Sequence, residues 1–174
     1  YISSLLIDKG ADINAHAEYV FHQFTALHWS AQEGYYDMCS MLIDKGADID
    51  RQTEKGQTAL SLASHNGHKN VIELLLEREA NVHLASNEQC TALHHAAQNG
   101  HIDICSMLIN KEVDINAQTE HGHTALTLAS SNGHTGSVQL LLEKGANVNL
   151  TDNAQWTALH YESRSGHVDI CAML

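Results

Sequence analysis

The sequence predicts an all-α protein built from stacked pairs of short helices, and three observations lead to this class. The tripeptide Thr-Ala-Leu returns at a fixed interval of 33 residues, starting at Thr25, Thr58, Thr91, Thr124 and Thr157. A constant period of this length is typical of repeat proteins whose units stack on one another. The apolar residues are mainly aliphatic, with only 5% aromatic residues and no proline, which favours closely packed helices.

The first helix of each repeat begins at the repeated threonine. Thr58 suits the N-cap position, because its hydroxyl can accept hydrogen bonds from backbone N–H groups of the first turn. Leu60, Ala63 and Ser64 follow at the spacing of one helix face. Gly67 is expected to end this helix, as glycine commonly does at the C′ position.

A second, more apolar helix follows in each repeat. Behind Gly67 its apolar face is formed by Val71, Ile72, Leu74, Leu75 and Leu76. Near its end stands a basic residue that suits the negative end of the helix dipole. The five residues at this position are Lys9, Lys45, Arg78, Lys111 and Lys144. Helices below roughly 12–15 residues are marginal in isolation, so each repeat must be stabilised by its neighbours.

The four cysteines do not form a disulfide framework. Cys39, Cys105 and Cys171 recur every 66 residues. Packed helices lie roughly 8–10 Å apart, so residues two repeats apart are too far for a disulfide, which needs Cα atoms within ~7 Å. We expect these three to be small buried side chains, and Cys90 to be a free thiol in a loop. This indicates a reducing, intracellular and cytoplasmic location.

The charge balance excludes several partners. The formal net charge is −12, from 21 acidic and 9 basic residues. Such a chain is repelled by nucleic acids and by anionic membrane surfaces. No apolar run has the length needed to cross a bilayer, so we expect no membrane insertion.

The repeated motif resembles that of the ankyrin repeat family. The matching elements in one repeat are Gly122 to Leu126, Gly133-His134, Leu140 to Leu142 and Gly145 to Asn149. The resemblance covers nearly the whole chain. It implies an ankyrin-repeat solenoid, in which stacked antiparallel helix pairs are joined by β-hairpin-like finger loops. The fingers and first helices are then expected to line a concave face.

We expect one array over residues 1–174, as a segment of a longer protein. The full repeats are 20–52, 53–85, 86–118 and 119–151. Residues 1–19 match the end of an earlier repeat with a three-residue insertion, and residues 152–174 match a truncated one. The last residues expose apolar groups, whereas a terminal repeat needs a polar cap.

The chain departs from the family pattern in the fingers. Gly56 and Gly122 keep the finger glycine, which permits positive φ. Alternate repeats carry glutamine there, at Gln23, Gln89 and Gln155. We therefore expect alternate fingers to turn differently. Glu162, in place of the usual alanine, and Gly136-Ser137 in a second helix are expected soft spots.

The histidines and carboxylates do not predict a metal site or an enzyme. Seven of the 14 histidines are explained by the resemblance: they occupy the motif positions that follow the threonine or the helix-ending glycine. His121 and His123 flank a finger glycine, but a closed zinc site needs about four ligands. An active site needs one asymmetric constellation, whereas Asp37, Asp103 and Asp169 recur with the repeat at helix starts. We expect no metal, no cofactor and no catalysis.

The remaining candidate residues lie where the family holds its partners, on the fingers and on the exposed face of the first helices. The finger positions are Phe21, Phe24, Glu54, Lys55, Gln57, Asn87, Glu88, Cys90, Glu120, His121, His123, Asn153 and Trp156. The helix positions are Trp29, Glu33, His65, His95 and Tyr161. Aromatic clusters at such places are typical binding anchors. As an alternative, the insertion packs Tyr19 and Phe21 onto their own repeat.

These residues predict a monomeric, non-enzymatic scaffold that binds a polypeptide on the concave face. The finger and first-helix candidates carry more carboxylates than basic side chains, so a neutral-to-basic partner is expected. The alternative is a structural or elastic spacer arm in a larger channel or cytoskeletal adaptor protein. A third hypothesis concerns Asn14 and Asn149, which resemble finger asparagines that a hydroxylase modifies in some ankyrin proteins.

Overall fold

The computed structural model describes residues 2–15, 23–172 and 174, and it divides into two compact units. The N-terminal unit is Tyr1–Asn81 and the C-terminal unit is Val82–Leu174. Within the described residues all regular structure is helical, apart from one isolated bridge between Ala85 and Thr91. The all-α prediction is confirmed.

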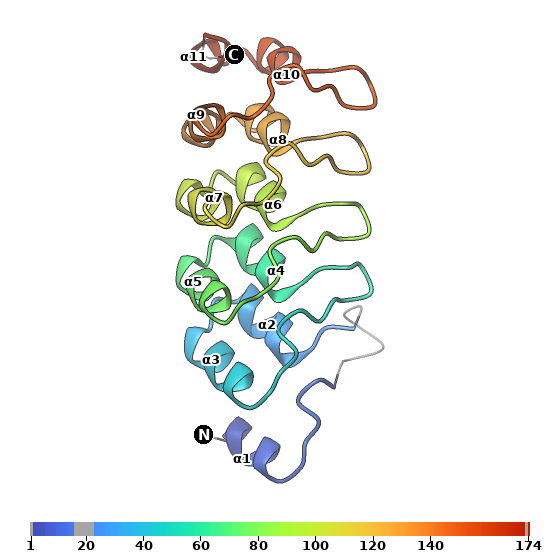
Figure 1. The fold of residues 1–174 in the computed structure, drawn as a ribbon, viewed down its shortest axis with the longest axis vertical. Coiled ribbons are helices and arrows are strands. Elements are labelled where there is room, and N and C mark those ends of the chain that lie inside the picture. The colour runs from blue at the N-terminus through green and yellow to red at the C-terminus, as the bar shows by residue number, and fades with distance from the viewer. Residues whose placement is uncertain (1, 16–22, 173) are drawn as a thin grey trace. The chain divides into compact units, whose positions relative to one another are not determined.

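The described part of the N-terminal unit contains two helix pairs and a preceding helix (Figure 1). Its helices are α1 (Ile2–Asp8), α2 (Ala26–Gln32), α3 (Tyr36–Asp44), α4 (Ala59–Asn66) and α5 (Lys69–Glu77). Helix α2 packs against α3 and α4, and α3 packs against α5. First helices therefore stack on first helices, and second helices on second helices.

The C-terminal unit repeats this arrangement in three helix pairs (Figure 1). Its helices are α6 (Ala92–Gln98), α7 (Ile102–Ile109), α8 (Ala125–Ser131), α9 (Thr135–Glu143), α10 (Ala158–Ser165) and α11 (Val168–Cys171). Helix α8 lies between α6 and α10, and α9 lies between α7 and α11. The fingers that precede α8 and α10 project to the same side of this unit.

The repeated threonine begins each first helix, as predicted. The Thr58 hydroxyl accepts from the Ser61 N–H at 3.2 Å, and the Ser61 hydroxyl oxygen accepts from the Thr58 N–H at 3.0 Å. This reciprocal pair satisfies two backbone donors that the helix itself leaves unpaired. Gly67 ends α4 with φ of 79°, in the left-handed region that glycine tolerates.

The motif histidines serve the scaffold. His28 Nδ1 accepts from the Thr25 N–H at 3.1 Å, so the ring proton is on Nε2, which donates to the Arg51 carbonyl at 2.9 Å. His94 bonds to Thr91 and Ala117 in the same way. Burial lowers the pKa of both imidazoles, which keeps them neutral.

The prediction that alternate fingers turn differently is wrong. Gln23, Gln89 and Gln155 adopt φ of 65°, 60° and 64°, close to 75° at Gly56 and 81° at Gly122. The same hydrogen bonds close both kinds of finger: the residue 86 N–H donates to the residue 90 carbonyl, as the residue 53 N–H does to that of residue 57. Glutamine in this conformation costs about 1–2 kcal/mol, which the loop hydrogen bonds offset.

Gly136 has a packing role that the sequence did not reveal. A Cβ atom at this position would lie 2.3 Å from Cδ1 of Ile102, on the neighbouring helix α7. Helix α9 runs through Gly136 and the buried Ser137 without a break. The glycine therefore makes room for a side chain of the preceding repeat.

The basic residues at the ends of the second helices also form ion pairs. In the N-terminal unit, Lys45 Nζ lies 2.6 Å from Asp8 Oδ1, and Arg78 Nη1 lies 2.5 Å from Asp44 Oδ1. Each pair joins the ends of two successive second helices. Both pairs are solvent-exposed, so each is expected to contribute only about 0–1 kcal/mol.

The cysteines are free, and two of the three predicted core thiols are fully buried. Cys39 and Cys105 are buried, but Cys171 is only partly covered, so that part of the prediction is wrong. Burial raises the pKa of the Cys105 thiol to about 12, which makes it unreactive at neutral pH.

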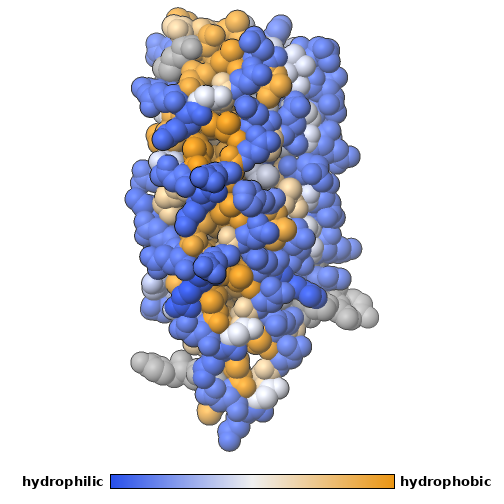
Figure 2. Space-filling model, in the orientation of Figure 1, coloured by the Kyte–Doolittle hydropathy of each residue, from blue (hydrophilic) through white to orange (hydrophobic). Residues whose placement is uncertain are grey.

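The surface differs between fingers and helices. Figure 2 shows hydrophilic residues over the fingers, whereas apolar residues reach the surface nearer to the helices. In the C-terminal unit Leu159 is 44% exposed, although the equivalent Leu126 is 1% exposed. No helix in the described part of the chain has the length and apolar character to cross a bilayer.

Candidate interaction surface

Five aromatic rings form a continuous row on the C-terminal unit. His121 lies 6.3 Å from His123, and His123 lies 6.0 Å from Tyr161, between ring centroids. Trp156 lies 5.2 Å from Tyr161 and 6.1 Å from His160. We call these five residues the aromatic row. Fingers supply the first two rings and Trp156, and helix α10 supplies Tyr161 and His160.

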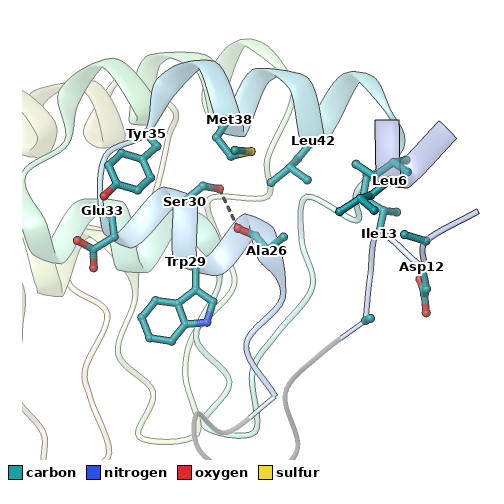
Figure 3. Close-up of a pocket in the computed structure, with 13 residues that line it drawn as sticks. Leu6, Asp12, Ile13, Ala26, Trp29, Ser30, Glu33, Tyr35, Met38 and Leu42 are labelled. Carbon is teal, nitrogen blue, oxygen red and sulfur yellow. Dashed lines mark hydrogen bonds between the residues drawn. The ribbon is translucent and has the colours of Figure 1, made fainter. Parts of the chain in front are cut away.

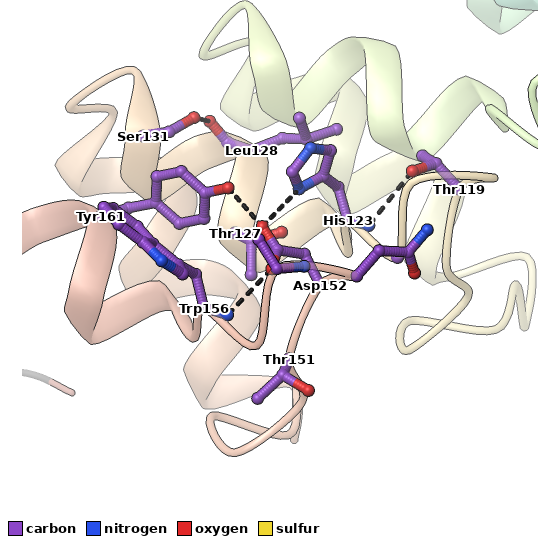
Figure 4. A network of polar contacts seen from close by, with 12 residues as sticks. Thr119, His123, Thr127, Leu128, Ser131, Thr151, Asp152, Trp156 and Tyr161 are labelled. Atoms are coloured by element: carbon purple, nitrogen blue, oxygen red, sulfur yellow. Dashed lines mark hydrogen bonds and ion pairs between the residues drawn. The ribbon is translucent and has the colours of Figure 1, made fainter.

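Asp152 contacts three residues of this row, Trp156, Tyr161 and His123 (Figure 4). Its Oδ1 accepts from the N–H groups of Trp156, at 2.8 Å, and Ala154, at 2.9 Å. Its Oδ2 accepts from the Tyr161 hydroxyl at 2.5 Å and lies 3.8 Å from His123 Nδ1. Asp152 is only 5% exposed, so its carboxylate oxygens bond to groups of the protein instead of solvent. These hydrogen bonds position the finger and Tyr161.

The sequence analysis did not select Asp152 as a site residue. Thr53, Ser86 and Thr119 occupy the equivalent positions, and each side-chain oxygen accepts from the backbone N–H four residues later. Asp152 keeps this loop bond and offers a second oxygen, which holds Tyr161. The sequence did offer one signal for Asp152: it has a carboxylate at a position where the other described repeats have a hydroxyl.

The Asp152–Tyr161 pair is a fixed support rather than an acid–base pair. Burial of Asp152 opposes its charge, but bonds from Tyr161 and two backbone N–H groups outweigh it and lower the pKa. Burial and the neighbouring carboxylate raise the pKa of Tyr161 to about 12. Near neutral pH the aspartate is therefore ionised and the tyrosine remains a donor.

Arg164 completes the site on the side of Trp156. Its guanidinium carbon lies 5.6 Å from the centroid of the indole ring. Trp156 is half-buried, and a cation–π contact at a solvent-accessible site is worth about 0.5–1 kcal/mol. The indole thus contacts both Arg164 and Tyr161.

The finger tips of the same unit are joined by hydrogen bonds to backbone carbonyls. The Glu120 N–H donates to the Glu88 carbonyl at 2.8 Å, and the Asn153 side chain donates to the Glu120 carbonyl at 3.0 Å. The carboxylates of Glu88 and Glu120 are exposed, as is Asn87. Cys90 is half-buried, and burial raises the pKa of its thiol.

A second aromatic pair occupies the equivalent place in the N-terminal unit. Phe24 and Trp29 lie 5.2 Å apart, at the repeat positions that Trp156 and Tyr161 hold in the other unit. Both side chains are half-buried. Phe21 lies outside the described residues.

The other candidates differ in their exposure to solvent. On the N-terminal unit the exposed ones are Glu33, Glu54, Lys55 and His65, and Gln57 is half-buried. On the C-terminal unit His95 is half-buried on α6. Within the described residues, no group of three or more His, Cys, Asp or Glu side chains is placed to hold a metal ion.

Trp29 also borders a cavity of about 580 Å³ that the sequence did not predict (Figure 3). Leu6 and Ile13 line one side of it, and Met38 and Leu42 line the other. Its polar groups include Asp12, Ser30 and Glu33. It is thus a mainly apolar hollow with carboxylates at its border.

The comparison with known proteins gives a family. A family model described as ankyrin repeats, in three copies, matches residues 1–53, 47–119 and 114–174. No curated protein matches the chain. Ankyrin repeats generally mediate protein binding and are typically not catalytic. With matches over its whole length, the chain belongs to the ankyrin repeat family.

Proposed function

We propose that this chain is a non-enzymatic scaffold that binds a polypeptide with its fingers and first helices. The aromatic row carries the proposal. Its rings are half-buried or exposed instead of packed in the core, and Asp152 holds the Tyr161 hydroxyl and the Trp156 backbone in place before any partner arrives. Anchors that are already ordered lose less conformational entropy on binding, and Trp and Tyr are enriched among the residues that dominate binding energy.

The charges on these surfaces support a neutral-to-basic partner. The exposed candidate residues include Glu33, Glu54, Glu88 and Glu120 against Lys55, with Arg164 beside Trp156 as a further cation. Complementary charge raises the association rate and excludes wrong partners. The affinity for the partner is therefore expected to fall as the salt concentration rises.

The test uses the whole chain as bait and the captured partner in a binding assay. Trp156→Ala should weaken binding about tenfold or more, which corresponds to about 1.4 kcal/mol. Tyr36→Ala removes an exposed aromatic side chain from the second helix α3 and should leave binding unchanged. Circular dichroism should show that both variants fold.

Two results would contradict the proposal. Equal binding by Trp156→Ala and the native chain would argue for the spacer role, in which the finger surface is not used. Affinity that rises with salt would exclude the charge complementarity. The free cysteines support an intracellular, cytoplasmic setting, which fractionation of cells that express the native protein can check.

A further inference from the structure

The accessible charges of the C-terminal unit are sorted along its finger surface. Exposed carboxylates stand on two successive finger tips, at Glu88 and Glu120. The next repeat carries the opposite charge, because Arg164 lies beside Trp156 on α10. Lys111 and Lys144, the other basic residues described in this unit, follow second helices instead.

The Asp152 carboxylate is engaged within the protein. Its oxygens already accept from Tyr161 and from two backbone N–H groups, and the side chain is buried. Arg164 is exposed, so a partner can contact the arginine directly but not the aspartate.

Contact with Trp156 leaves Arg164 able to bind an anion. A guanidinium carries five N–H donors in one plane, and an aromatic contact leaves donors available for a carboxylate. These donors match the two oxygens of a carboxylate. The aromatic contact also restrains the side chain, which lowers the entropy lost when the carboxylate binds.

On the basis of the proposed function, we propose that the polypeptide bound by this unit carries three groups in a fixed order. Basic side chains lie opposite Glu88 and Glu120, an apolar side chain packs on Tyr161 and Trp156, and a carboxylate pairs with Arg164. The partner is thus basic towards the finger tips and acidic at its other end.

The repeat spacing gives the separation between the group that faces Glu120 and the group that faces the aromatic anchor. Stacked helices lie roughly 8–10 Å apart, and an extended chain advances about 3.3 Å per residue. One repeat therefore corresponds to about three residues of the partner. The basic residue that faces Glu120 is expected about three positions from the apolar anchor.

Selection from a random peptide library on the whole chain tests this order. Peptides about 12 residues long are sufficient to cross three fingers when extended. We expect enriched peptides to carry a basic, an apolar and an acidic residue in this order or its reverse. Arg164→Glu should weaken such peptides at least about tenfold. Replacing the acidic residue of the peptide with lysine should restore binding to that variant.

The matched control is Lys144→Glu, the same charge reversal at the C-cap of the second helix α9 in the same unit. It should leave peptide affinity unchanged within about twofold, and thermal unfolding should show that both variants fold. Trp156→Phe keeps an aromatic ring if Trp156→Ala fails to fold.

The outcomes separate the two proposals. If no peptide family is enriched on the native chain, the proposed function itself is overturned. If peptides are enriched and need Trp156, but bind Arg164→Glu and Glu120→Lys as tightly as the native chain, only the charge order is overturned. If the peptide exchange rescues Arg164→Glu, the position of the acidic group is established.

Discussion

A carboxylate oxygen of Glu162 lies 2.8 Å from Nδ1 of His167, at a place where three other repeats have alanine. Glu162 is 0% exposed, and its second oxygen is buried without a hydrogen-bond partner. The Ser130 hydroxyl of α8 lies near the carboxylate but forms no well-directed bond to it. His167 favours the ionised form of Glu162, whereas burial disfavours it and has the larger effect. A half-satisfied buried acid therefore lies within the last described helix pair.

Glu162→Gln is expected to stabilise the protein at neutral pH. Burial raises the pKa of Glu162 above its ordinary value of 4.5, so the folded chain keeps this proton when the unfolded chain has lost it. The contribution of Glu162 to the free energy of unfolding is therefore fully present below pH 4.5. It is lost as the pH rises through the pKa that Glu162 has in the folded chain. Glutamine keeps the shape without the charge. We expect a gain of about 1–3 kcal/mol near pH 7 that disappears below pH 4.5, by urea unfolding.

The control for this prediction is Glu143→Gln, because Glu143 is exposed on α9. Its effect should stay within about 0.5 kcal/mol at every pH. A native chain that is more stable than Glu162→Gln near neutral pH would show that the attraction to His167 outweighs the burial of the charge.

Tyr161→Phe is expected to destabilise the C-terminal unit by about 1.5–3 kcal/mol, the usual worth of a hydrogen bond to a charged group. The pKa of Asp152 is lowered in the folded chain, so its contribution is present above its ordinary value of 3.8 and is lost as pH falls. The pKa of Tyr161 is raised to about 12, so stability from its proton is lost as pH rises from 10 towards 12. Phenylalanine should remove the alkaline dependence.

Ultraviolet absorbance at alkaline pH measures the ionisation of the tyrosine side chains directly. The native chain should contain one tyrosine that ionises near pH 12, and Tyr161→Phe should lack it. Tyr36→Phe, at an exposed position, should retain it. If the Tyr161→Phe variant still shows a tyrosine that ionises near pH 12, that ionisation belongs to another residue.

The repeat, the helix starts and most of the core were predictable, because they follow from short-range rules. Thr58 caps α4 through a residue three positions away, and the apolar faces follow the helix period. The contact between Asp152 and Tyr161 was not predictable. It joins a finger to a helix nine residues later and depends on side-chain rotamers that no periodicity encodes.

The finger conformation shows a different limit of sequence reasoning. A glycine-to-glutamine change predicts a different turn when the residue is considered alone. In the structure the loop hydrogen bonds around it are repeated in every described finger, and they impose positive φ on glutamine as well.

Gln89→Gly is accordingly expected to stabilise the chain by about 0.5–1 kcal/mol. The change removes strain of about 1–2 kcal/mol but increases the entropy of the unfolded chain.

Gly122→Ala should destabilise by more than about 1 kcal/mol. Its Cβ atom would meet left-handed strain and would also lie 2.8 Å from the Cα atom of Asp152. Thermal unfolding of Gln89→Gly and Gly122→Ala measures whether each change raises or lowers the stability of the chain. A lower stability of Gln89→Gly would show that the glutamine side chain stabilises the finger.

The last prediction concerns Gly136 and Ile102, which a double-mutant cycle can separate. Alanine has a helix propensity about 1 kcal/mol better than glycine, but the new Cβ atom would lie 2.3 Å from Cδ1 of Ile102. Ile102 is partly exposed and can turn outward at the cost of its contacts. Gly136→Ala alone should therefore gain little stability or lose some.

Ile102→Val removes the methyl group that causes the conflict, so in this background Gly136→Ala should stabilise α9 by about 0.5–1 kcal/mol. Chemical unfolding of the four chains should give a coupling energy of at least about 0.5 kcal/mol. Glu143→Ala, at the far end of α9, should show no coupling to Ile102→Val. Equal effects of Gly136→Ala in both backgrounds would mean that the glycine is a weak point of the helix, as the sequence alone suggests, and that Ile102 does not require it.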